Sequence, residues 1–300
     1  MDKKILKKAE EILRQKKVEK EIAAKLNLDK AVENVAFRNC FETERAGTIA
    51  LAKEESLGNT PKKEEFLKLN HLREQEQQLL KNMGMTLKDI YPNYECKLCN
   101  DTGYVQGEYC VCLKKEINKL LFEELGRKEP LKTFEQDTIH HKSFEIMKKW
   151  CELNNKYLNV IICGPVGTGK TFLAECVANE LIKKNMLVAI TTAIDLNNNM
   201  LGYHVAQNEE KVGILQNYLD AEVLIIDDLG TEPMLKNVTK EYLYYIISER
   251  MNMKKRTIIT TNLDLNNLNE YYEDRIASRL IDKRTTLHIY IDQEDLRMKK

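Results

Sequence analysis

A glycine-rich segment near the middle of the chain has the residue types and spacing of a phosphate-binding loop. It follows the apolar run 160–163 and precedes residues 172–182, in which apolar side chains recur at helical spacing. A G-x-x-x-x-G-K-[ST] match requires this order of strand, loop and helix. Glycines let the backbone curl so that N–H groups point at phosphate oxygens, and the helix N-terminus adds partial positive charge. The expected nucleotide-binding residues here are Gly164, Pro165, Val166, Gly167, Thr168, Gly169, Lys170, Thr171 and Phe172.

Two side chains at the end of this loop have the chemistry of phosphoryl transfer. Lys170 is expected to project from the loop into solvent and to reach the β- and γ-phosphates. The hydroxyl of Thr171 is expected to hold Mg²⁺. A glycine turn before an ordinary helix is the structural alternative. Because the flanking strand and helix patterns both agree with the loop, the sequence favours phosphate binding.

Two further apolar runs end in polar residues. The run 223–226 ends in Asp227 and Asp228, and the run 257–261 ends in Asn262. In parallel α/β sheets, ligands bind at the carboxyl ends of strands. We therefore expect Asp227 to hold Mg²⁺, Asp228 to orient or deprotonate water, and Asn262 to hydrogen-bond that water or the γ-phosphate. For each residue the alternative is a solvated strand end with no catalytic role.

Four cysteines occur close together as C-x₂-C, a spacer, and C-x-C. They are Cys96, Cys99, Cys110 and Cys112. The first pair has the spacing of a zinc knuckle, and residues 100–103 form a turn sequence that brings the chain back to the second pair. A structural Zn²⁺ is the favoured interpretation; a redox dithiol and chance clustering are the alternatives. The other cysteines, at positions 40, 151, 163 and 176, are expected to be buried as small apolar residues.

The composition limits the class of protein. The chain has 300 residues, 43% of them hydrophobic, and 47 basic residues balance 47 acidic ones, so net charge does not indicate a nucleic-acid partner. No apolar run approaches the roughly 20 residues that span a bilayer. The N-terminal residues carry no apolar segment typical of a signal peptide. We therefore expect a cytoplasmic protein, away from membranes, with cysteines reduced or metal-bound.

The periodicity of apolar residues divides the chain. Residues 1–92 show helical stripes, typical of a small bundle or of a region that leaves one stripe free for a partner. The cysteines and a short helix occupy 93–126, and 126–130 is the best linker candidate. Beyond residue 127, apolar β-rich runs alternate with helices, which predicts an α/β domain with a five-stranded parallel sheet covered on both faces. The runs are 159–163, 187–192, 223–227, 257–262 and 287–291.

The region from about 130 to 297 resembles the AAA+ ATPases of the bacterial replicative-helicase-loader family, the DnaC/DnaI type, close to the IstB-like ATPases of transposons. The motifs that carry the resemblance are the phosphate loop 164–171, the segments 226–230, 246–250 and 257–262, and the Arg-x-x-x-Arg segment 275–280. Some loaders also have a similar cysteine module before the ATPase domain. The resemblance therefore predicts an AAA+ P-loop NTPase domain that binds ATP and Mg²⁺, preceded by a helical domain with a zinc module.

The resemblance also implies roles for single residues. Asn262 matches the sensor-1 asparagine, and Arg279 matches the arginine finger offered to a neighbouring subunit's ATP, with Arg275 one helical turn before it. Arg297 falls where a sensor-2 arginine would act on the γ-phosphate of its own subunit. Each arginine has a surface cation as its alternative. Most AAA+ proteins have Asp-Glu where this chain and the loaders have Asp-Asp, so slow, assembly-dependent hydrolysis of ATP to ADP and phosphate is expected.

The implied function is loading of a replicative DNA helicase onto single-stranded DNA. The N-terminal helices and zinc module would bind the helicase, and the ATPase domain would bind ATP, self-associate and contact single strands. One alternative is an IstB-like transposition helper that binds DNA, and another is a zinc-containing adaptor with a purely structural nucleotide site. The nine residues after position 291 are too few for a helical lid, so a processive unfoldase is not expected.

Overall fold

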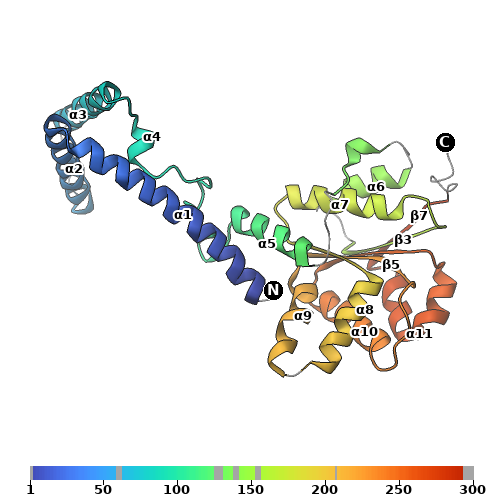
Figure 1. Ribbon diagram of the computed structural model, residues 1–300. Coiled ribbons are helices and arrows are strands. Elements are labelled where there is room, and N and C mark those ends of the chain that lie inside the picture. The colour runs from blue at the N-terminus through green and yellow to red at the C-terminus, as the bar shows by residue number, and fades with distance from the viewer. Residues whose placement is uncertain are drawn as a thin grey trace. The chain divides into compact units, whose positions relative to one another are not determined.

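The computed structural model describes residues 3–58, 63–124, 131–137, 142–152, 157–206 and 208–292, without the side chains of 208–212 and 266. Contacts divide the chain into two compact units. The N-terminal unit comprises residues 11–108, and the C-terminal unit comprises residues 109–300 with the first ten residues (Figure 1). The linker candidate 126–130 lies outside the described residues.

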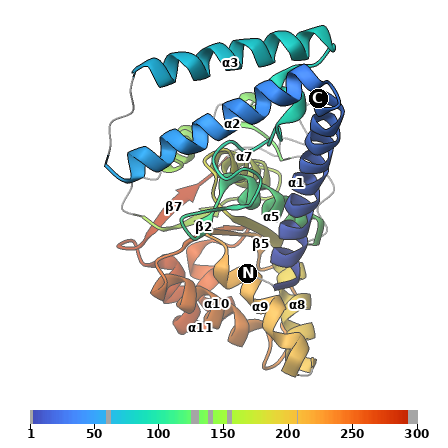
Figure 2. The same cartoon turned by 90° about the vertical axis from the view of Figure 1, so that its left-hand side faces the viewer.

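The N-terminal unit is helical, as the apolar stripes predict. Its helices are α1 (Lys3–Val32), α2 (Val35–Ser56), α3 (Lys63–Asn82) and α4 (Leu87–Ile90). The side chain of Asn34 starts α2 by accepting hydrogen bonds from the backbone N–H groups of Ala36 at 3.0 Å and Phe37 at 3.1 Å. Helices α2 and α3 run side by side (Figure 2). Phe37 and Phe41 stack with ring centroids 5.6 Å apart inside the small core of this unit.

The remaining elements follow in chain order. They are β1 (Tyr104–Val105), β2 (Glu108–Tyr109), α5 (Val111–Glu124), η1 (Phe134–Gln136), α6 (Lys142–Trp150), β3 (Asn159–Cys163), α7 (Lys170–Lys183), β4 (Val188–Thr192), α8 (Ala193–Val205), α9 (Asn208–Asp220), β5 (Val223–Leu229), α10 (Thr239–Asn252), β6 (Arg256–Thr261), α11 (Leu265–Ile281) and β7 (Thr286–Tyr290). Strands β1 and β2 form a small ribbon.

The predicted five-stranded parallel sheet is confirmed. Its strands lie in the order β4-β5-β6-β3-β7, and every neighbouring pair is parallel. Helices α6 and α7 cover one face, and helices α8 to α11 cover the other (Figure 1). Along β3, Ile161 packs into the core under α8 to α11, whereas Val160 and Ile162 pack into the core under α6 and α7. Burial on both faces explains why the strands read as continuous apolar runs.

A fully buried arginine stabilises the sheet where β5 and β6 begin, at the ends of the strands opposite the nucleotide loop. Arg250, near the end of α10, is 0% exposed. Its guanidinium donates hydrogen bonds to the carbonyl oxygens of Tyr218 at 2.6 Å, Ala221 at 2.9 Å and Arg256 at 2.5 Å. Burial lowers the pKa of Arg250 to about 9, so it remains protonated at neutral pH. This residue, part of the segment 246–250, therefore has a structural role.

The helices of the structure can be compared with the length and apolar character of a membrane-spanning helix. Among the helices built from described residues, none combines the length and the apolar character needed to cross a bilayer.

Candidate functional site

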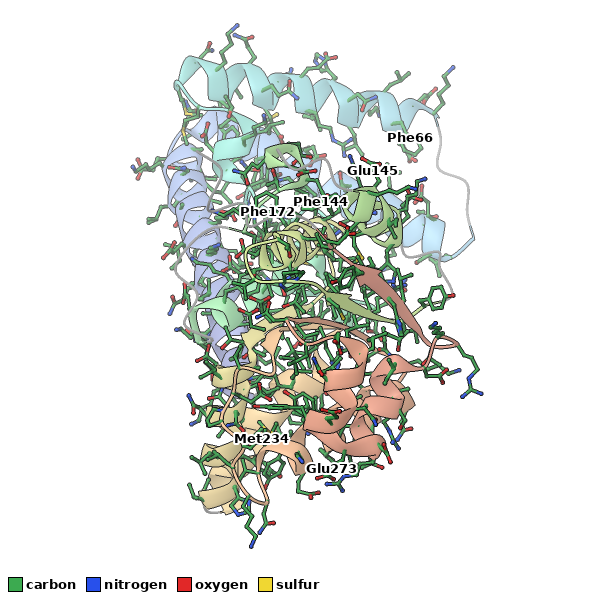
Figure 3. All side chains as sticks on the ribbon, turned by 90° about the vertical axis from the view of Figure 1, so that its right-hand side faces the viewer. Phe66, Phe144, Glu145, Phe172, Met234 and Glu273 are labelled. Carbon is green, nitrogen blue, oxygen red and sulfur yellow. The ribbon has the colours of Figure 1, made fainter. Side chains whose placement is uncertain are left out.

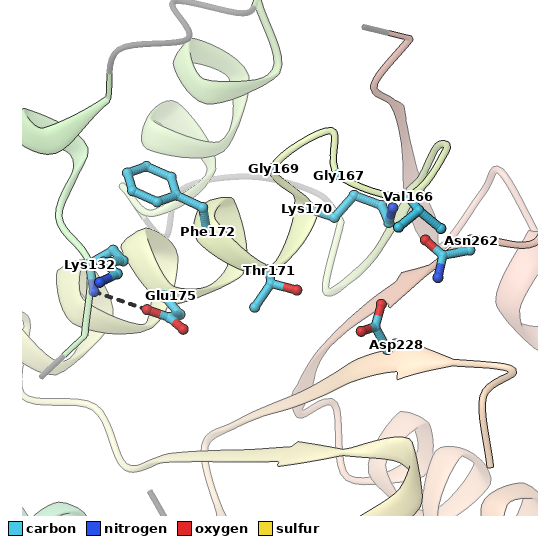
Figure 4. Close-up of a pocket in the computed structure, with 10 residues that line it drawn as sticks. All are labelled: Lys132, Val166, Gly167, Gly169, Lys170, Thr171, Phe172, Glu175, Asp228 and Asn262. Carbon is cyan, nitrogen blue, oxygen red and sulfur yellow. Dashed lines mark hydrogen bonds between the residues drawn. The ribbon is translucent and has the colours of Figure 1, made fainter. Parts of the chain in front are cut away.

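A pocket of about 330 Å³ opens where β3, β5 and β6 end, at the carboxyl edge of the sheet. Figure 4 shows the side chains around it. The lining residues are Lys132, Val166, Gly167, Gly169, Lys170, Thr171, Phe172, Glu175, Asp228 and Asn262. The structure thus brings the phosphate-loop segment together with the ends of two strands, as the sequence predicts. Lys132 and Glu175 were not predicted.

The path of the loop explains two of its glycines. Gly164 has φ +152, and a Cβ there would lie 2.2 Å from the carbonyl oxygen of Ile291, so no side chain fits. Gly169 has φ 90, a left-handed conformation, and immediately precedes α7. Between them, the hydroxyl of Thr168 donates to the carbonyl of Pro165 at 3.0 Å, which closes the turn. The backbone of the loop is therefore shaped before any ligand arrives.

Lys170 lies against the loop and does not project into solvent. Its side chain is only 5% exposed, contrary to the prediction from sequence. The ammonium donates hydrogen bonds to the carbonyl oxygens of Gly164 at 2.8 Å and Pro165 at 2.6 Å. These carbonyls are dipoles that a lysine charge satisfies when no phosphate is nearby. The sequence could not show this contact, because it depends on the curl of the loop.

Asp227 lies next to Thr171, the pairing that the magnesium prediction requires. The Thr171 hydroxyl is 2.9 Å from Oδ2 and 3.2 Å from Oδ1 of Asp227. Oδ1 also accepts a hydrogen bond from the hydroxyl of Thr260 at 2.6 Å, which fixes the carboxylate from the side of β6. One hydroxyl and one carboxylate at the edge of an open pocket are oxygen ligands of the type that Mg²⁺ takes. These residues therefore fit the ion, and the remaining positions would be left to water and phosphate.

Asp228 has an unusual backbone conformation that turns its side chain into the pocket. Its φ is 56, in the left-handed region, and the pairing of β5 with β6 shifts register between Ile226 and Leu229. Its N–H donates to the hydroxyl of Thr260 at 2.8 Å, and its carbonyl accepts from the hydroxyl of Thr231 at 2.8 Å. Successive side chains on a regular strand point to opposite faces, and such an irregularity re-aims one of them. Hence Asp228 lines the pocket while the preceding Asp227 contacts Thr171 in its wall.

Asn262 also lines the pocket, directly after β6. The hydroxyl of its neighbour Thr261 donates a hydrogen bond to the carbonyl of Leu229 at 2.6 Å. The Thr261 hydroxyl oxygen also accepts a hydrogen bond from the N–H of Leu263 at 3.0 Å. The end of β6 is thereby attached to the end of β5. Asn262 and Asp228 consequently face the same pocket from two connected strands (Figure 4).

The far wall of the pocket comes from a segment before α6. The carboxylate of Glu175 accepts a hydrogen bond from the backbone N–H of Lys132 at 3.2 Å (Figure 4). One turn later on α7, the amide of Asn179 donates to the carbonyl of Lys132 at 3.2 Å. At this wall the ring of Phe172 lies 5.9 Å from that of Phe144 (Figure 3). The spacing of Glu175 and Asn179 on one helix face was the only sequence signal for this wall.

The predicted finger arginines do not line this pocket. Arg279 donates to the hydroxyl of Tyr244 at 2.9 Å and lies 4.5 Å from its ring, and Arg275 donates to Glu241 at 2.7 Å. Both lie on the side of α11 that contacts α10, where Arg275 is exposed and Arg279 is half-buried against Tyr244. Their roles stay predictions. Arg297 lies outside the described residues, so its expected role cannot be placed.

The four clustered cysteines meet as predicted. The Sγ atoms of Cys96, Cys99, Cys110 and Cys112 all lie within 4.8 Å of one another. Four thiolates at such separations fit a tetrahedral ion such as Zn²⁺. Cys99 and Cys110 are buried, and the other two are partly exposed.

The chain around the first pair is held in a knuckle. Asp101 accepts from the backbone N–H groups of Cys96 at 2.7 Å and Glu95 at 2.9 Å, and the N–H of Gly103 points at the sulfur of Cys99 at 3.3 Å. Asn100 and Asp101 have φ 52 and 57, so the turn is left-handed over two residues. N–H groups aimed at a sulfur stabilise a thiolate. This supports metal ligation over a disulfide.

The remaining cysteines are buried, as predicted. Burial raises the pKa of Cys151 and Cys176 to about 12, and that of Cys163 to about 11. Burial also raises the pKa of Cys40. Thiols of this kind are unreactive and pack as small apolar groups.

Comparisons with known proteins agree with this site. Residues 133–300 match the family described as IstB-like ATP binding protein. The replicative helicase loader DnaC of Buchnera aphidicola subsp. Schizaphis graminum is 28% identical over 154 residues, which are 49% of this chain and 62% of the relative. The replicative helicase loader DnaC of Escherichia coli strain K12 is 25% identical over 129 residues, 43% of this chain and 52% of the relative. The matches thus span roughly half to three fifths of these relatives.

Solved structures give weaker likenesses. A crystal structure of the DnaC helicase loader is 22% identical with a TM-score of 0.45, covering 58% of this chain and 99% of the other. A crystal structure of DnaI has the same identity and TM-score, covering 58% and 92%. The family match covers more than half of the chain and includes every motif around the pocket. On that match, this chain belongs to the IstB-like ATP-binding protein family.

Proposed function

We propose that this protein is an ATPase that loads a replicative DNA helicase onto single-stranded DNA. The observation that carries the ATPase part is the contact of Thr171 with Asp227 beside a preshaped phosphate loop. The similarity to replicative helicase loaders supports the loading part.

The pocket residues divide the work of hydrolysis among them. Backbone N–H groups of residues 164–171 cradle the phosphates, and Lys170 moves its ammonium from the loop carbonyls to the β- and γ-phosphates. Thr171 and Asp227 would hold Mg²⁺, which would offset charge on the phosphates. Asp228 accepts a proton from the attacking water, and Asn262 orients that water. The products are ADP and phosphate.

Hydrolysis would depend on self-association. Arg279 is half-buried against Tyr244, donates to its hydroxyl, and does not line the pocket of its own chain. Released from Tyr244, its guanidinium would reach a second copy and stabilise charge on the transferring phosphoryl group. Arg297 would act on the γ-phosphate of its own chain. A slow enzyme that becomes active on assembly is the expected behaviour.

The N-terminal unit and the cysteine cluster would bind the helicase. The cluster has the four thiolates of a structural Zn²⁺ site, and the ion would fold a segment that has little core of its own. The ATPase domain would contact single-stranded DNA through basic and aromatic side chains, the usual means of binding single strands.

A second candidate is a transposition helper that binds duplex DNA. The match to the family described as IstB-like ATP binding protein favours this candidate, because the IstB-like ATPases are the transposition helpers that the sequence resembles. A zinc-containing adaptor with a structural nucleotide site is the least favoured, since Lys170, Thr171 and Asp227 are all in place around an open pocket.

The test is a pull-down from a native lysate with and without ATP, followed by a loading assay on circular single-stranded DNA with the captured helicase. Capture of a hexameric helicase and ATP-dependent transfer to the circle support the loader. Capture of a transposase, with retention on duplex DNA only, supports the transposition helper. If the protein hydrolyses no ATP with either captured partner, the adaptor with a structural nucleotide site is the supported function.

A further inference from the structure

A buried carboxylate outside the pocket connects the catalytic loop to the arginine-bearing helix. Glu232, three residues after β5, is 3% exposed. One of its oxygens accepts from the backbone N–H of Gly230 at 2.9 Å, and the other accepts from the hydroxyl of Tyr272 in α11. Among the described residues, no lysine, arginine or histidine forms an ion pair with it. Burying a carboxylate without a cation costs desolvation free energy. We therefore expect this contact to have a role in the function of the site.

One end of the connection is rigidly attached to the pocket. Gly230 follows Asp228 by two residues, and the N–H of Thr231 donates back to the carbonyl of Asp228 at 3.3 Å. Gly230 has φ +102, and a Cβ there would lie 2.7 Å from the side chain of Leu263, the residue after Asn262. The turn that carries Glu232 therefore packs against the segments that carry both Asp228 and Asn262.

The other end of the connection is a break in α11. Tyr272 is 0% exposed and anchors the first half of this helix in the core. The next residue, Glu273, has φ 68 and ψ 159, so the helix is interrupted there. The second half, with Arg275 and Arg279, starts directly after the break. Figure 3 shows Glu273 at the surface of this unit.

The contacts on the outer side of the break are weaker than the buried one. Lys240 pairs with Glu273 at 2.7 Å, and Glu241 pairs with Arg275 at 2.7 Å, and all four side chains are substantially exposed. Exposed pairs of this kind contribute little and are screened by salt. The second half is also held in the core by Ile276 and Ala277, which are both 0% exposed. The buried bond from Tyr272 is the contact that connects the start of this half to the turn after Asp228.

We propose that Glu232 and Tyr272 are positioning residues that couple the Asp228 turn to the presentation of Arg279. Through them, a shift of the turn when the pocket fills with nucleotide is passed to the start of the arginine half of α11. The inference rests on the proposed function, because it takes Arg279 to act on a neighbouring chain.

The first test is Tyr272→Phe, which removes the hydroxyl and keeps the ring. Tyr290→Phe is the matched control, since Tyr290 is 59% exposed on the edge strand β7. We expect both variants to bind a fluorescent ATP analogue as the native chain does and to keep its melting temperature within a few degrees. Tyr272→Phe should lose turnover on the order of tenfold or more, because misplacing a catalytic group by about 1 Å has effects of that size. Wild-type turnover would overturn the proposal.

Mixing experiments then identify which half of the shared site fails. If Tyr272 positions Arg279, Tyr272→Phe chains keep a working pocket and lack a working arginine. Activity should return when they are mixed with Asp228→Asn chains, which keep the turn and supply Arg279, and should not return with Arg279→Ala chains. The opposite pattern would mean that Tyr272 serves its own pocket, and recovery in both or neither mixture would mean a general structural effect. Each of these overturns the proposal.

A parallel mixture of Asp228→Asn with Arg279→Ala separates this inference from the proposed function. If activity recovers in this mixture but the Tyr272→Phe mixtures do not show the expected pattern, only the positioning role of Tyr272 is refuted. No recovery there, in chains that associate, refutes the shared site and the inference with it. Glu232→Gln provides a second variant of the same contact, since an amide can accept from only one of the two donors. It should show the Tyr272→Phe pattern of recovery with a smaller loss of turnover.

Discussion

Thr171 and Asp227 are 56 positions apart in the sequence, and the hydroxyl of one lies 2.9 Å from the carboxylate of the other. Thr171 belongs to the first turn of α7, and Asp227 lies near the end of β5. The parallel sheet brings them together because both the loop before α7 and the end of β5 lie on the same edge. The hydroxyl of Thr260, from the neighbouring strand β6, holds the same carboxylate at 2.6 Å. The pair proposed to hold Mg²⁺ is thus aligned by three separate segments.

Lys170→Ala should remove nucleotide binding. In the structure the ammonium satisfies two loop carbonyls, so the substitution also leaves those carbonyls unpaired and should lower stability by about 1–3 kcal/mol. Binding of a fluorescent ATP analogue and release of phosphate are the measurements. Lys183→Ala, at the exposed far end of α7, is the control and should match the native chain. If Lys170→Ala hydrolyses ATP at the native rate, the assignment of the site is wrong.

Asp228→Asn should keep ATP binding and lose hydrolysis. Asparagine tolerates the left-handed backbone that Asp228 adopts, with φ 56, so the turn should survive while the proton acceptor is lost. We expect turnover to fall by about 10²–10⁴-fold, the usual contribution of a general base. Asp228→Ala should have the same loss of turnover and a further loss of stability from backbone strain, about 1–2 kcal/mol. Equal turnover in Asp228→Asn and the native chain would exclude a role as base.

The sequence predicted those parts of the site that a short motif can encode. The loop, Asp227, Asp228 and Asn262 follow strand ends, and strand ends of a parallel sheet meet at one edge. Lys132 and Glu232 could not be predicted, because their positions depend on how distant segments pack. The burial of Lys170 was missed for a related reason: a loop residue is expected to face solvent, but here the loop curls around its own lysine.

Purified protein prepared without chelator should contain about one Zn per chain, bound by four sulfurs. Cys96→Ser or Cys110→Ser should release the metal and disorder residues 94–113, while the nucleotide pocket keeps its ATP affinity. Cys40→Ala is the control, because it removes a thiol from the N-terminal unit without touching the cluster. Elemental analysis and sulfur-ligand absorption with Co²⁺ are the measurements. A metal-free protein in which this segment stays protected from proteolysis would contradict the proposal.

The N-terminal unit should become less stable as the pH rises from about 4.5 to 7. Burial raises the pKa of Glu76 from 4.5 to about 7, with a further contribution from Glu44, and its Oε1 has no hydrogen-bond partner among the residues that the structure describes. The unfolded chain therefore releases this proton at lower pH than the folded chain, so ionisation opposes folding, by about 1–3 kcal/mol above pH 7. Glu76→Gln should raise the melting temperature at pH 8 and have little effect at pH 4. The exposed Glu74→Gln should change neither, and an unaltered pH profile in Glu76→Gln would rule out this origin.

Arg279→Ala should separate ATP binding from ATP hydrolysis. The side chain does not line its own pocket, so Lys170 and Thr171 should bind nucleotide as before. A guanidinium supplied by a neighbour typically contributes about 10³–10⁵-fold to turnover, and loss of most activity is expected even where the chains still associate. Arg284→Ala is the matched control, because Arg284 is exposed and pairs with nearby Asp282.

The dependence of turnover on protein concentration distinguishes an arginine supplied by a neighbouring chain from one that acts within its own chain. Native turnover per chain should rise with protein concentration as chains associate, and Arg279→Ala should stay low at every concentration, with an unchanged dissociation constant for the ATP analogue. Arg275 is the competing candidate for the finger, since it lies one turn earlier on the same side of α11 and is exposed, bonded to Glu241. If Arg275→Ala gives the larger loss and Arg279→Ala gives little, the finger is Arg275. If neither substitution lowers turnover at high concentration, hydrolysis is completed within one chain and the shared site has to be abandoned.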